Sequence, residues 1–416
     1  MRFSGFDDEW KSCRFDELFD FQVAGDMKKE LFNEEFIDEY KYPLYANALE
    51  NEGLLGYYKE YKYNPNSITV TARGNIGHAT ARKNKFNAVG RLIILTPKED
   101  LNIEFFTEYI NNNVKIYIES TGVPQLTAPS LKINKLHYPT LNEQNKISNL
   151  LIMLNNKIEL LGQKHQLYQY FKKYLMQQIF TQKLRFVDFN NSSWKDYKFK
   201  DLGTVKSGVG FSNKYQGHLD LDYNFYKVSD MNLKGNEKVM TRSNNTIDDN
   251  LLKDIGVKLI ENPSIIFAKV GEAIFLNRKR IAKQPFLIDN NMMAFSPNEN
   301  VDLEFMYYLA TSINFGKYAQ TGALPSYNAS DIYSIKCKIP PIEEQKRIGK
   351  LLSLADNKID FCSNQLNKTQ EFKKGLLQQM FVVRINWRCN FKLAKSPSFN
   401  KHLLILKNKI IFIIIK

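Results

Sequence analysis

The sequence predicts an α+β fold in which two mixed α/β domains are separated by two long helices that pair as an antiparallel coiled coil, a tandem pseudo-twofold repeat. One observation is an amphipathic segment that occurs twice, at residues 139–180 and 340–381, without a gap and at a constant offset of 201 positions. A second is that WKSCRFDELFDF at 10–21 matches WKDYKFKDLGTV at 194–205. A repeat of this length exceeds the roughly 20–50 residues of a solenoid unit, so it indicates duplication of a whole domain with its helix.

The repeated segments have the period of an α-helix. Their apolar residues recur in steps of three and four, and no proline follows Pro139 in the first copy, so a helix of about 37 residues and about 55 Å is allowed. Only a short segment separates Phe180 from Trp194, so the second domain starts at the far end of the first helix and the second helix must return antiparallel. The predicted coiled-coil core is Ile147, Leu151, Leu154, Ile158, Leu161, Ile348, Leu352, Ile359 and Leu376.

These patterns divide the chain into five segments. They are a first domain at 1–138, a first helix at 139–183, a second domain at 184–338, a second helix at 339–381 and a tail at 382–416. The tail holds eight basic residues and no acidic one, and its apolar runs are too short to cross a bilayer. We expect it to be disordered or an aberrant extension rather than a membrane tether.

Each domain mixes strands with short helices. Runs rich in β-branched residues at 67–72, 90–96, 263–268 and 291–295 are bounded by Gly, Pro and Asn, which is typical of strands. The segments after Asn102 and Asp302 have a helical pattern, and these two residues are suitable N-caps. Between such anchors the domains differ strongly, which indicates that the scaffold was copied while the loops diverged.

Catalytic motifs are not found in the sequence. It has no GxxxxGK[ST] phosphate loop, no Asn/Asp-Pro-Pro-aromatic signature and no triad pattern among its five histidines. The four cysteines are scattered, which favours a reduced cytoplasmic protein without a zinc site, and the start of the chain lacks a secretory signal. We therefore expect no catalytic residue, no metal ligand and no cofactor in this chain.

Basic loops are the candidate binding residues. The net charge is +14, of which the tail contributes eight, and the remaining +6 favours a polyanionic partner only weakly. Arginine and asparagine recognise guanine and adenine edges, whereas lysine mainly contacts phosphates. The alternative is that these residues belong to ordinary solvated hairpin loops. The predicted DNA-binding residues are Arg73, Asn75, His78, Arg82, Lys83 and Lys85 in the first domain and Lys269, Asn277, Arg278, Lys279 and Arg280 in the second.

One family shares these motifs. The repeated P-x-[LI]-x-E-Q-x-[KR]-I-x-x-L-L-x-x-x-[DN]-N-K-I, which ends in F-K-K-x-L-x-Q-Q-[IM]-F, and the GNIG turn at 74–77 strongly resemble the specificity subunit of type I restriction-modification systems. The family usually ends near the second QQ-[IM]-F. The tail at 382–416 is therefore unexpected and suggests a frameshift or readthrough.

The resemblance implies two target-recognition domains that read the halves of a bipartite, asymmetric site in double-stranded DNA, with the helices setting the spacer. It implies two methyltransferase subunits that methylate adenine N6 with S-adenosylmethionine, joined by ATP-driven restriction subunits. S-adenosylmethionine, ATP and Mg²⁺ are thus expected on partner subunits, this chain is expected to perform no chemistry, and the complex is expected in the cytoplasm without membrane contact.

Two other interpretations remain open. The chain could be a structural or adaptor coiled-coil protein whose two domains bind protein, or an autonomous restriction enzyme, for which the motifs are missing. Salt-dependent binding to one bipartite duplex separates DNA recognition from the adaptor interpretation. Methylation of DNA by the isolated chain would support the interpretation as an autonomous restriction enzyme.

Overall fold

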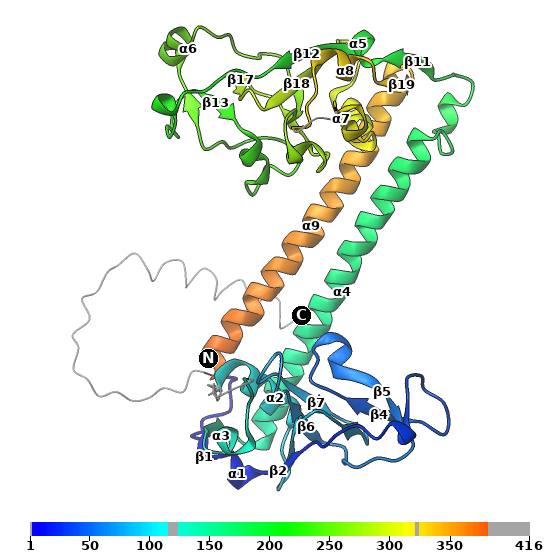
Figure 1. Cartoon of the computed structure of the whole chain (residues 1–416). Coiled ribbons are helices and arrows are strands. Elements are labelled where there is room, and N and C mark those ends of the chain that lie inside the picture. The colour runs from blue at the N-terminus through cyan, green and yellow to red at the C-terminus, as the bar shows by residue number, and fades with distance from the viewer. Residues whose placement is uncertain (1, 115–123, 321–323, 382–416) are drawn as a thin grey trace, which may run out of the picture. The chain divides into compact units, whose positions relative to one another are not determined.

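The computed structural model describes residues 2–114, 124–320 and 324–381, so the tail at 382–416 lies outside the described residues. Packing divides the chain into two compact units: unit 1 contains residues 1–152 and those from Lys373 onward, and unit 2 is Met153–Phe372. Both boundaries fall inside the two longest helices, α4 (Leu141–Phe180) and α9 (Ile342–Phe381) (Figure 1). Each long helix therefore contributes residues to both units.

Unit 1 is built around a four-stranded antiparallel sheet of order β2-β9-β6-β7. Its central strands come from two of the predicted runs, and Ile68, Val70 and Ile94 in them are fully buried. A second sheet has the order β3-β5-β4-β8, in which β4 and β8 are parallel. The strands are β2 (Phe19–Val23), β3 (Phe32–Asn33), β4 (Tyr42–Tyr45), β5 (Leu54–Tyr58), β6 (Ser67–Val70), β7 (Ala79–Arg82), β8 (Asn87–Ala88) and β9 (Ile93–Pro97).

Helix α2 (Ile103–Asn113) packs against β6 and β7 and buries one apolar face. It begins at the predicted cap, since Asn102 Oδ1 accepts a hydrogen bond from Phe105 N at 2.8 Å. Phe106 packs edge-on against Phe19 of β2, with 5.3 Å between ring centroids. The remaining elements of the unit are β1 (Lys11–Arg14), α1 (Phe15–Leu18), α3 (Ala128–Lys132) and β10 (Lys135–Tyr138), with 3₁₀ helices at Lys29–Leu31 and Glu50–Gly53.

Unit 2 repeats this plan. Its main antiparallel sheet has the order β12-β18-β15-β16, and a smaller sheet has the order β14-β13-β17. The strands are β11 (Lys195–Lys198), β12 (Gly203–Ser207), β13 (Tyr223–Tyr226), β14 (Thr246–Ile247), β15 (Ser264–Ala268), β16 (Lys279–Ala282), β17 (Phe286–Ile288), β18 (Met292–Pro297) and β19 (Lys336–Ile339). The helices are α5 (Phe199–Leu202), α6 (Asp249–Ile255), α7 (Leu303–Ser312) and α8 (Ala329–Tyr333), with 3₁₀ helices at Val187–Phe189, Asn213–Tyr215, Val228–Asn232, Glu272–Ile274 and Phe315–Tyr318.

The duplication extends to strand register. In unit 1, β2 pairs with β9 from Phe19 opposite Pro97 to Val23 opposite Ile93. In unit 2, β12 pairs with β18 from Gly203 opposite Pro297 to Ser207 opposite Met293. The smaller sheets differ: the one in unit 1 has four strands, including the pair β3 and β5, whereas the one in unit 2 has three strands. The two units therefore share a scaffold and differ in the elements inserted into it, as the sequence predicted.

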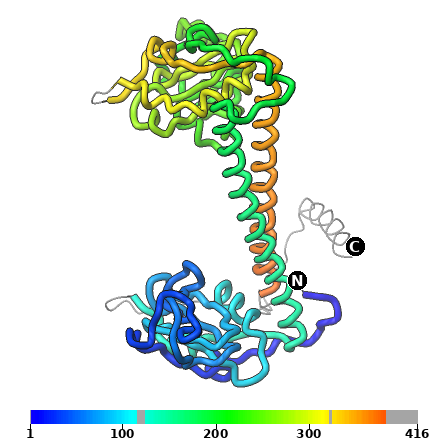
Figure 2. Tube along the Cα trace, turned by 90° about the vertical axis from the view of Figure 1, so that its right-hand side faces the viewer, coloured from blue at the N-terminus to red at the C-terminus, as the bar shows by residue number. Residues whose placement is uncertain are grey.

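Helices α4 and α9 run side by side in unit 2, as residues 153–180 and 342–372 show in Figures 1 and 2. Cys362 Sγ donates to the Leu161 carbonyl oxygen at 3.4 Å, and Lys172 Nζ lies 2.5 Å from Asp356 Oδ1. Residue numbers rise along one helix as they fall along the other, so the pairing is antiparallel. This confirms the predicted direction.

The predicted coiled-coil core is buried unequally. Ile147, Leu151 and Leu376 in unit 1 and Ile348 and Leu352 in unit 2 are buried, with relative exposures of 5% or less. The other four predicted core residues are half-buried, because two helices alone cover only part of a seam where no domain packs on it. These four are Leu154, Ile158, Leu161 and Ile359.

The glutamine of the repeated Glu-Gln pair forms two hydrogen bonds near the start of each long helix. In unit 1, Gln144 Oε1 accepts from Asn102 N at 3.0 Å and Nε2 donates to the Pro139 carbonyl at 2.9 Å. In unit 2, Gln345 makes the same two bonds, to Asp302 N at 2.9 Å and to the Pro340 carbonyl at 3.0 Å. The repeated glutamine thus joins α4 to the N-cap of α2 and α9 to the N-cap of α7.

Candidate functional site

One basic loop of unit 1, residues 71–78, joins β6 to β7. Gly77 N donates to the Thr71 carbonyl at 2.7 Å, and His78 N donates to Thr71 Oγ1 at 2.9 Å. Both glycines of the GNIG turn have positive φ, which glycine adopts without strain. This tight turn leaves the side chains of Arg73, Asn75 and His78 exposed, so three predicted residues lie together on one loop.

Two exposed lysines follow β7. Lys83 Nζ lies 2.5 Å from Glu104 Oε1, and Lys85 Nζ lies 4.2 Å from the centroid of the Tyr61 ring. Exposed ion pairs of this kind contribute about 0–1 kcal/mol, so an incoming phosphate can replace Glu104 at little cost. Desolvation, and then the nearby Arg82, lower the pKa of His78.

Arg82 differs from its predicted companions because it is buried, with a relative exposure of 4%. Its guanidinium carbon lies 3.5 Å from the centroid of Tyr45, Nε donates to Thr69 Oγ1 at 2.9 Å, and Nη2 donates to the Glu52 carbonyl at 2.8 Å. Burial lowers its pKa. Its side chain therefore holds neighbouring segments of unit 1 together and is not exposed as the sequence predicted.

The equivalent loop of unit 2, residues 269–278 between β15 and β16, is longer and includes a 3₁₀ helix. Asn277 has a positive φ of 50° and is half-buried. Its Oδ1 accepts from Phe315 N at 3.0 Å, and its Nδ2 donates to the Ile313 carbonyl at 3.1 Å. Asn277 thus anchors the 313–315 segment, a role that the sequence did not indicate.

The side chains of Lys279 and Arg280 also bond to other segments of unit 2. Lys279 is 2% exposed; its Nζ lies 4.0 Å from the centroid of Phe315 and donates to Asn277 Oδ1 and, at 2.9 Å, to the Ile313 carbonyl. Arg280 is half-buried and donates to the Met231 carbonyl at 3.3 Å. In this cluster Arg278 is exposed and Lys269 half-exposed, so these two remain accessible.

We expect Lys279→Met to leave binding of any polyanion unchanged and to alter stability with a distinct pH dependence. Burial lowers the pKa of Lys279 to about 7, below the roughly 10.4 of a free lysine. Between these values the unfolded chain binds the extra proton, so the native lysine makes stability rise as pH rises. Thermal unfolding of both proteins from pH 7 to 10 tests this. As pH rises, the melting temperature of the native protein should rise relative to that of the methionine variant.

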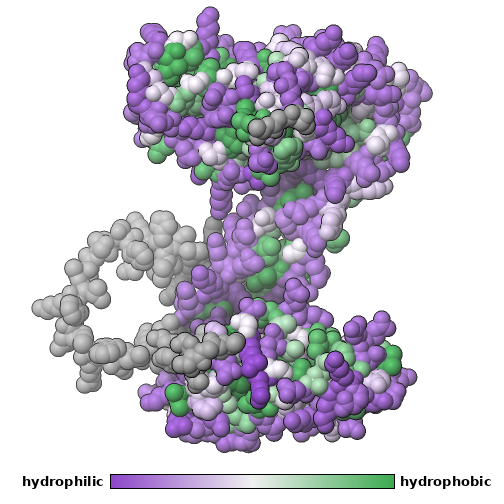
Figure 3. Space-filling model, viewed as in Figure 1, coloured by the Kyte–Doolittle hydropathy of each residue, from purple (hydrophilic) through white to green (hydrophobic). Residues whose placement is uncertain are grey.

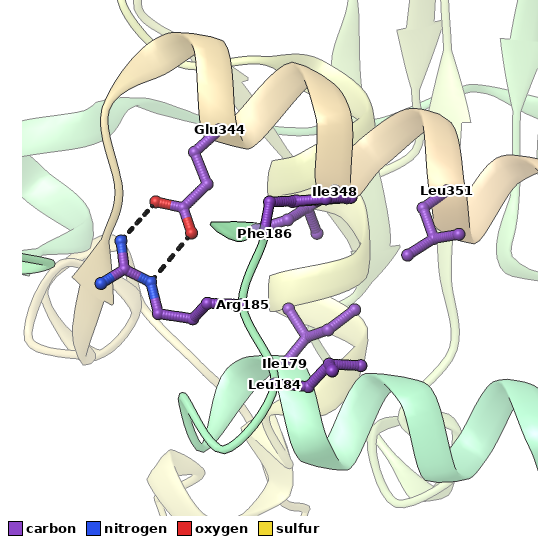
Figure 4. A pocket seen from close by; sticks show the side chains of 7 residues that line it. All are labelled: Ile179, Leu184, Arg185, Phe186, Glu344, Ile348 and Leu351. Carbon is purple, nitrogen blue, oxygen red and sulfur yellow. Dashed lines mark hydrogen bonds and ion pairs between the residues drawn. The ribbon is translucent and has the colours of Figure 1, made fainter. Parts of the chain in front are cut away.

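A cavity of about 110 Å³ lies where α4 ends and α9 begins in unit 2 (Figure 4). Its lining is mainly apolar, with Ile179, Phe186 and Ile348 turned toward it, and Arg185 and Glu344 form an ion pair at one side. Arg185 Nη2 lies 2.7 Å from Glu344 Oε2, and this bonding raises the pKa of Arg185. The volume is below the roughly 300–1,000 Å³ of usual ligand pockets, so the cavity is a feature of a structural junction.

The junction reveals a repeated motif that the sequence analysis missed. Arg2-Phe3-x-x-Phe6 and Arg185-Phe186-x-x-Phe189 both precede the repeated tryptophan. Arg2 Nη2 lies 2.6 Å from Glu143 Oε2, just as Arg185 pairs with Glu344. In each unit a basic residue of the long helix, Lys146 or Arg347, lies within 6.0 Å of both phenylalanine rings. The motif can be read in the sequence, but its spacing is not constant. The arginine lies 8 residues before the tryptophan in the first copy and 9 residues before it in the second.

Within residues 2–114, 124–320 and 324–381, no group of three or more His, Cys, Asp or Glu side chains is arranged to hold a metal ion. No helix in the same part of the chain has the length and apolar character needed to cross a membrane.

Comparisons with known proteins agree on one family. The family model described as the type I restriction modification DNA specificity domain matches residues 7–167 and 191–371. A type I specificity subunit of Mycoplasma pneumoniae is 30% identical over 188 residues, which cover 42% of this chain and only 51% of that relative. The MjaVIII specificity subunit of Methanocaldococcus jannaschii is 20% identical over 91% of this chain and 93% of its own length.

A solved structure shares the fold. The S subunit of a type I restriction-modification system from M. genitalium superposes with a TM-score of 0.61 at 17% identity, covering 91% of this chain and 96% of that one. The family match spans both globular parts and most of both long helices, which are the two halves of the duplication described above. The chain therefore belongs to the family of type I restriction-modification DNA specificity subunits.

Proposed function

We propose that each unit reads one half of a bipartite, asymmetric site in double-stranded DNA, and that the long helices set the unread spacer. The observation that carries this proposal is one scaffold with two unlike loops. Strands β2–β9 and β12–β18 share one register, while the β6–β7 turn is tight and the β15–β16 connection contains a 3₁₀ helix. Equal scaffolds with unequal loops suit the recognition of two unlike half-sites.

The exposed cations supply the chemistry for each half-site. Arg73 and Asn75 are free to form bidentate contacts to guanine or adenine, and Lys83 and Lys85 to neutralise phosphates. In unit 2, Arg278 and Lys269 are the accessible counterparts. The buried Arg82 and Lys279 and the half-buried Arg280 bond to neighbouring segments of their own unit, and we assign them a supporting role rather than DNA contact.

The same proposal assigns the chemistry to partners. Two methyltransferase subunits dock on the long helices and methylate adenine N6 with S-adenosylmethionine, and restriction subunits that use ATP and Mg²⁺ join them. The chain itself provides DNA recognition and docking surfaces. An adaptor that binds two proteins remains the competing function.

Mapping of N6-methyladenine in the host genome, with and without this gene, tests the proposal. A bipartite motif that disappears on deletion is the expected result, and an unchanged methylation pattern would contradict it. Duplexes carrying that motif then give the salt dependence of binding by the purified chain. Binding that depends on neither the salt concentration nor the DNA sequence would favour the adaptor function instead.

We expect Arg73→Ala to weaken binding to the cognate duplex by about 1–3 kcal/mol and to relax specificity in one half-site only. Lys85→Ala should weaken binding to all DNA sequences alike and reduce the slope of log affinity against log salt concentration by about 0.9. Lys135→Ala, an exposed lysine of β10 outside the loop, is the matched control and should change neither quantity. Fluorescence anisotropy with each half-site scrambled in turn provides the measurement.

A further inference from the structure

A second chain segment lies against the loop between β6 and β7 in unit 1. It consists of residues 124–127, which precede α3, and its Leu126 N donates to the Ala72 carbonyl at 2.9 Å. Next to this backbone bond, Arg73 Nη2 donates to Gln125 Oε1 at 3.4 Å. The glutamine side chain therefore lies beside the arginine to which the proposed function assigns base recognition, although 52 positions separate them in the sequence.

Unit 2 repeats this arrangement with other side chains. Tyr327 N donates to the Lys269 carbonyl at 3.0 Å, and Val270 and Ser326 form an isolated antiparallel bridge. A proline precedes Ser326, just as a proline precedes the glutamine of unit 1. At the equivalent positions Val270 thus replaces the arginine of unit 1, and Ser326 replaces its glutamine.

The backbone at Arg73 is also held from another side. Asn47 Oδ1 accepts from Ala72 N at 2.7 Å and from Arg73 N at 3.4 Å. Asn47 Nδ2 donates to the Gly90 carbonyl, which joins this contact to the turn before β9. The loop backbone is therefore positioned before DNA binds, and a preorganised loop loses less conformational entropy on binding.

An arginine and a glutamine side by side match two neighbouring base pairs. Arginine donates two hydrogen bonds to guanine O6 and N7, and glutamine forms two with adenine N6 and N7. The side-chain carbonyl oxygen of Gln125 has two lone pairs, so it can accept from Arg73 and from adenine N6 together. The 3.4 Å between the two side chains is about one base-pair step of DNA.

The four side chains are accessible to a ligand. Arg73 is exposed, and Gln125, Val270 and Ser326 are half-exposed. The face of each unit drawn in Figure 3 is mostly hydrophilic. Interfaces with DNA are more polar than interfaces between proteins, so a surface of this kind suits contact with base edges and phosphates.

We propose that Gln125 is a second base-reading residue of unit 1, and that it selects an adenine next to the guanine selected by Arg73. This rests on the proposed function. In unit 2, Val270 and Ser326 occupy the corresponding positions, where valine offers an apolar contact and serine bonds to more than one base. The two half-sites therefore differ at corresponding base pairs because this pair of residues differs.

Two reciprocal variants of the full chain, Gln125→Ser and Ser326→Gln, test the inference and serve as controls for each other. Their binding is measured on duplexes that carry the methylated motif, with each half-site position substituted in turn. Gln125→Ser should lower the preference for adenine about 5- to 150-fold at one position, adjacent to the position where Arg73→Ala lowers the preference for guanine. Ser326→Gln should change a base preference in the other half-site only.

Serine is the residue that the scaffold holds at this place in unit 2, so circular dichroism of Gln125→Ser should match that of the native chain. Three results would overturn the inference: unchanged base preferences in Gln125→Ser, an equal loss of affinity for all sequences, or a changed position that is not adjacent to that of Arg73. If only Arg73→Ala relaxes a position, the inference fails while the proposed function stands. If neither variant changes any base preference, the recognition role of this loop fails as well.

Discussion

Replacement of Glu344 by alanine is expected to destabilise unit 2 by about 3–5 kcal/mol, the cost of leaving a buried ionic partner uncompensated. Glu344 has a relative exposure of 0%, and it accepts hydrogen bonds from Arg185 Nε at 3.1 Å, Arg185 Nη2 at 2.7 Å and Trp194 Nε1 at 3.3 Å. Alanine removes all three acceptor contacts and leaves the guanidinium of Arg185 without a counter-charge, bonded only to the carbonyl and hydroxyl oxygens of Ser192. Guanidinium chloride unfolding measures the loss.

The neighbouring Glu343 is the matched control. Its ion pair with Lys346 is mostly exposed, with side-chain exposures of 66 and 56%, so Glu343→Ala should cost no more than about 0.5 kcal/mol. The double variant Arg185→Ala with Glu344→Ala should be less destabilised than the two single losses added together, because the partners share one interaction. Equal costs at positions 343 and 344 would refute the structural role of the buried pair.

Insertion of one heptad into both long helices is expected to lengthen the preferred DNA spacer by about 3 base pairs while both half-site sequences are kept. Seven residues add about 10 Å to a helix, and DNA rises by about 3.4 Å per base pair. The hydrogen bond between Cys362 and Leu161 fixes the register, so the insertions belong after Leu161 and before Cys362. Affinity for the original spacer should fall at least about 100-fold, toward non-specific binding.

An insertion in α4 alone is the informative control. It shifts Lys172 away from Asp356 by one heptad and breaks the antiparallel seam, so it should lower the unfolding midpoint instead of moving the spacer. Binding selection from a library of spacer lengths gives the readout for both proteins. A stable paired insertion that retains the original spacer would rule out the helices as the determinant of spacing.

The long helices and the duplicated scaffold were predictable because both depend on local or repeated signals. Steps of three and four residues define α4 and α9, and the caps Asn102 and Asp302 each accept the predicted backbone hydrogen bond. Antiparallel pairing followed from the short connection after Phe180, since a brief linker leaves few topologies. These features need no knowledge of distant contacts.

The candidate site was less predictable because exposure of a basic residue depends on distant chain segments. Lys279 and Arg82 look like loop cations in the sequence, yet Phe315 and Tyr45 cover them in the fold. Arg73 and Asn75 were predicted on a turn whose glycines already indicated close approach, and the structure leaves their side chains exposed. Whether they read bases stays a prediction.

The last turn of α9 has a consequence for biosynthesis. Phe381 packs against Trp10, Phe105 and Tyr109, with ring centroids 5.5–6.5 Å apart, and its carbonyl accepts from Asn113 at 2.9 Å. The aromatic patch of Trp10, Phe105 and Tyr109 therefore stays open during synthesis until the chain has been made as far as Phe381. Any truncated product that stops before this phenylalanine exposes the patch permanently, which marks it for chaperones and proteases.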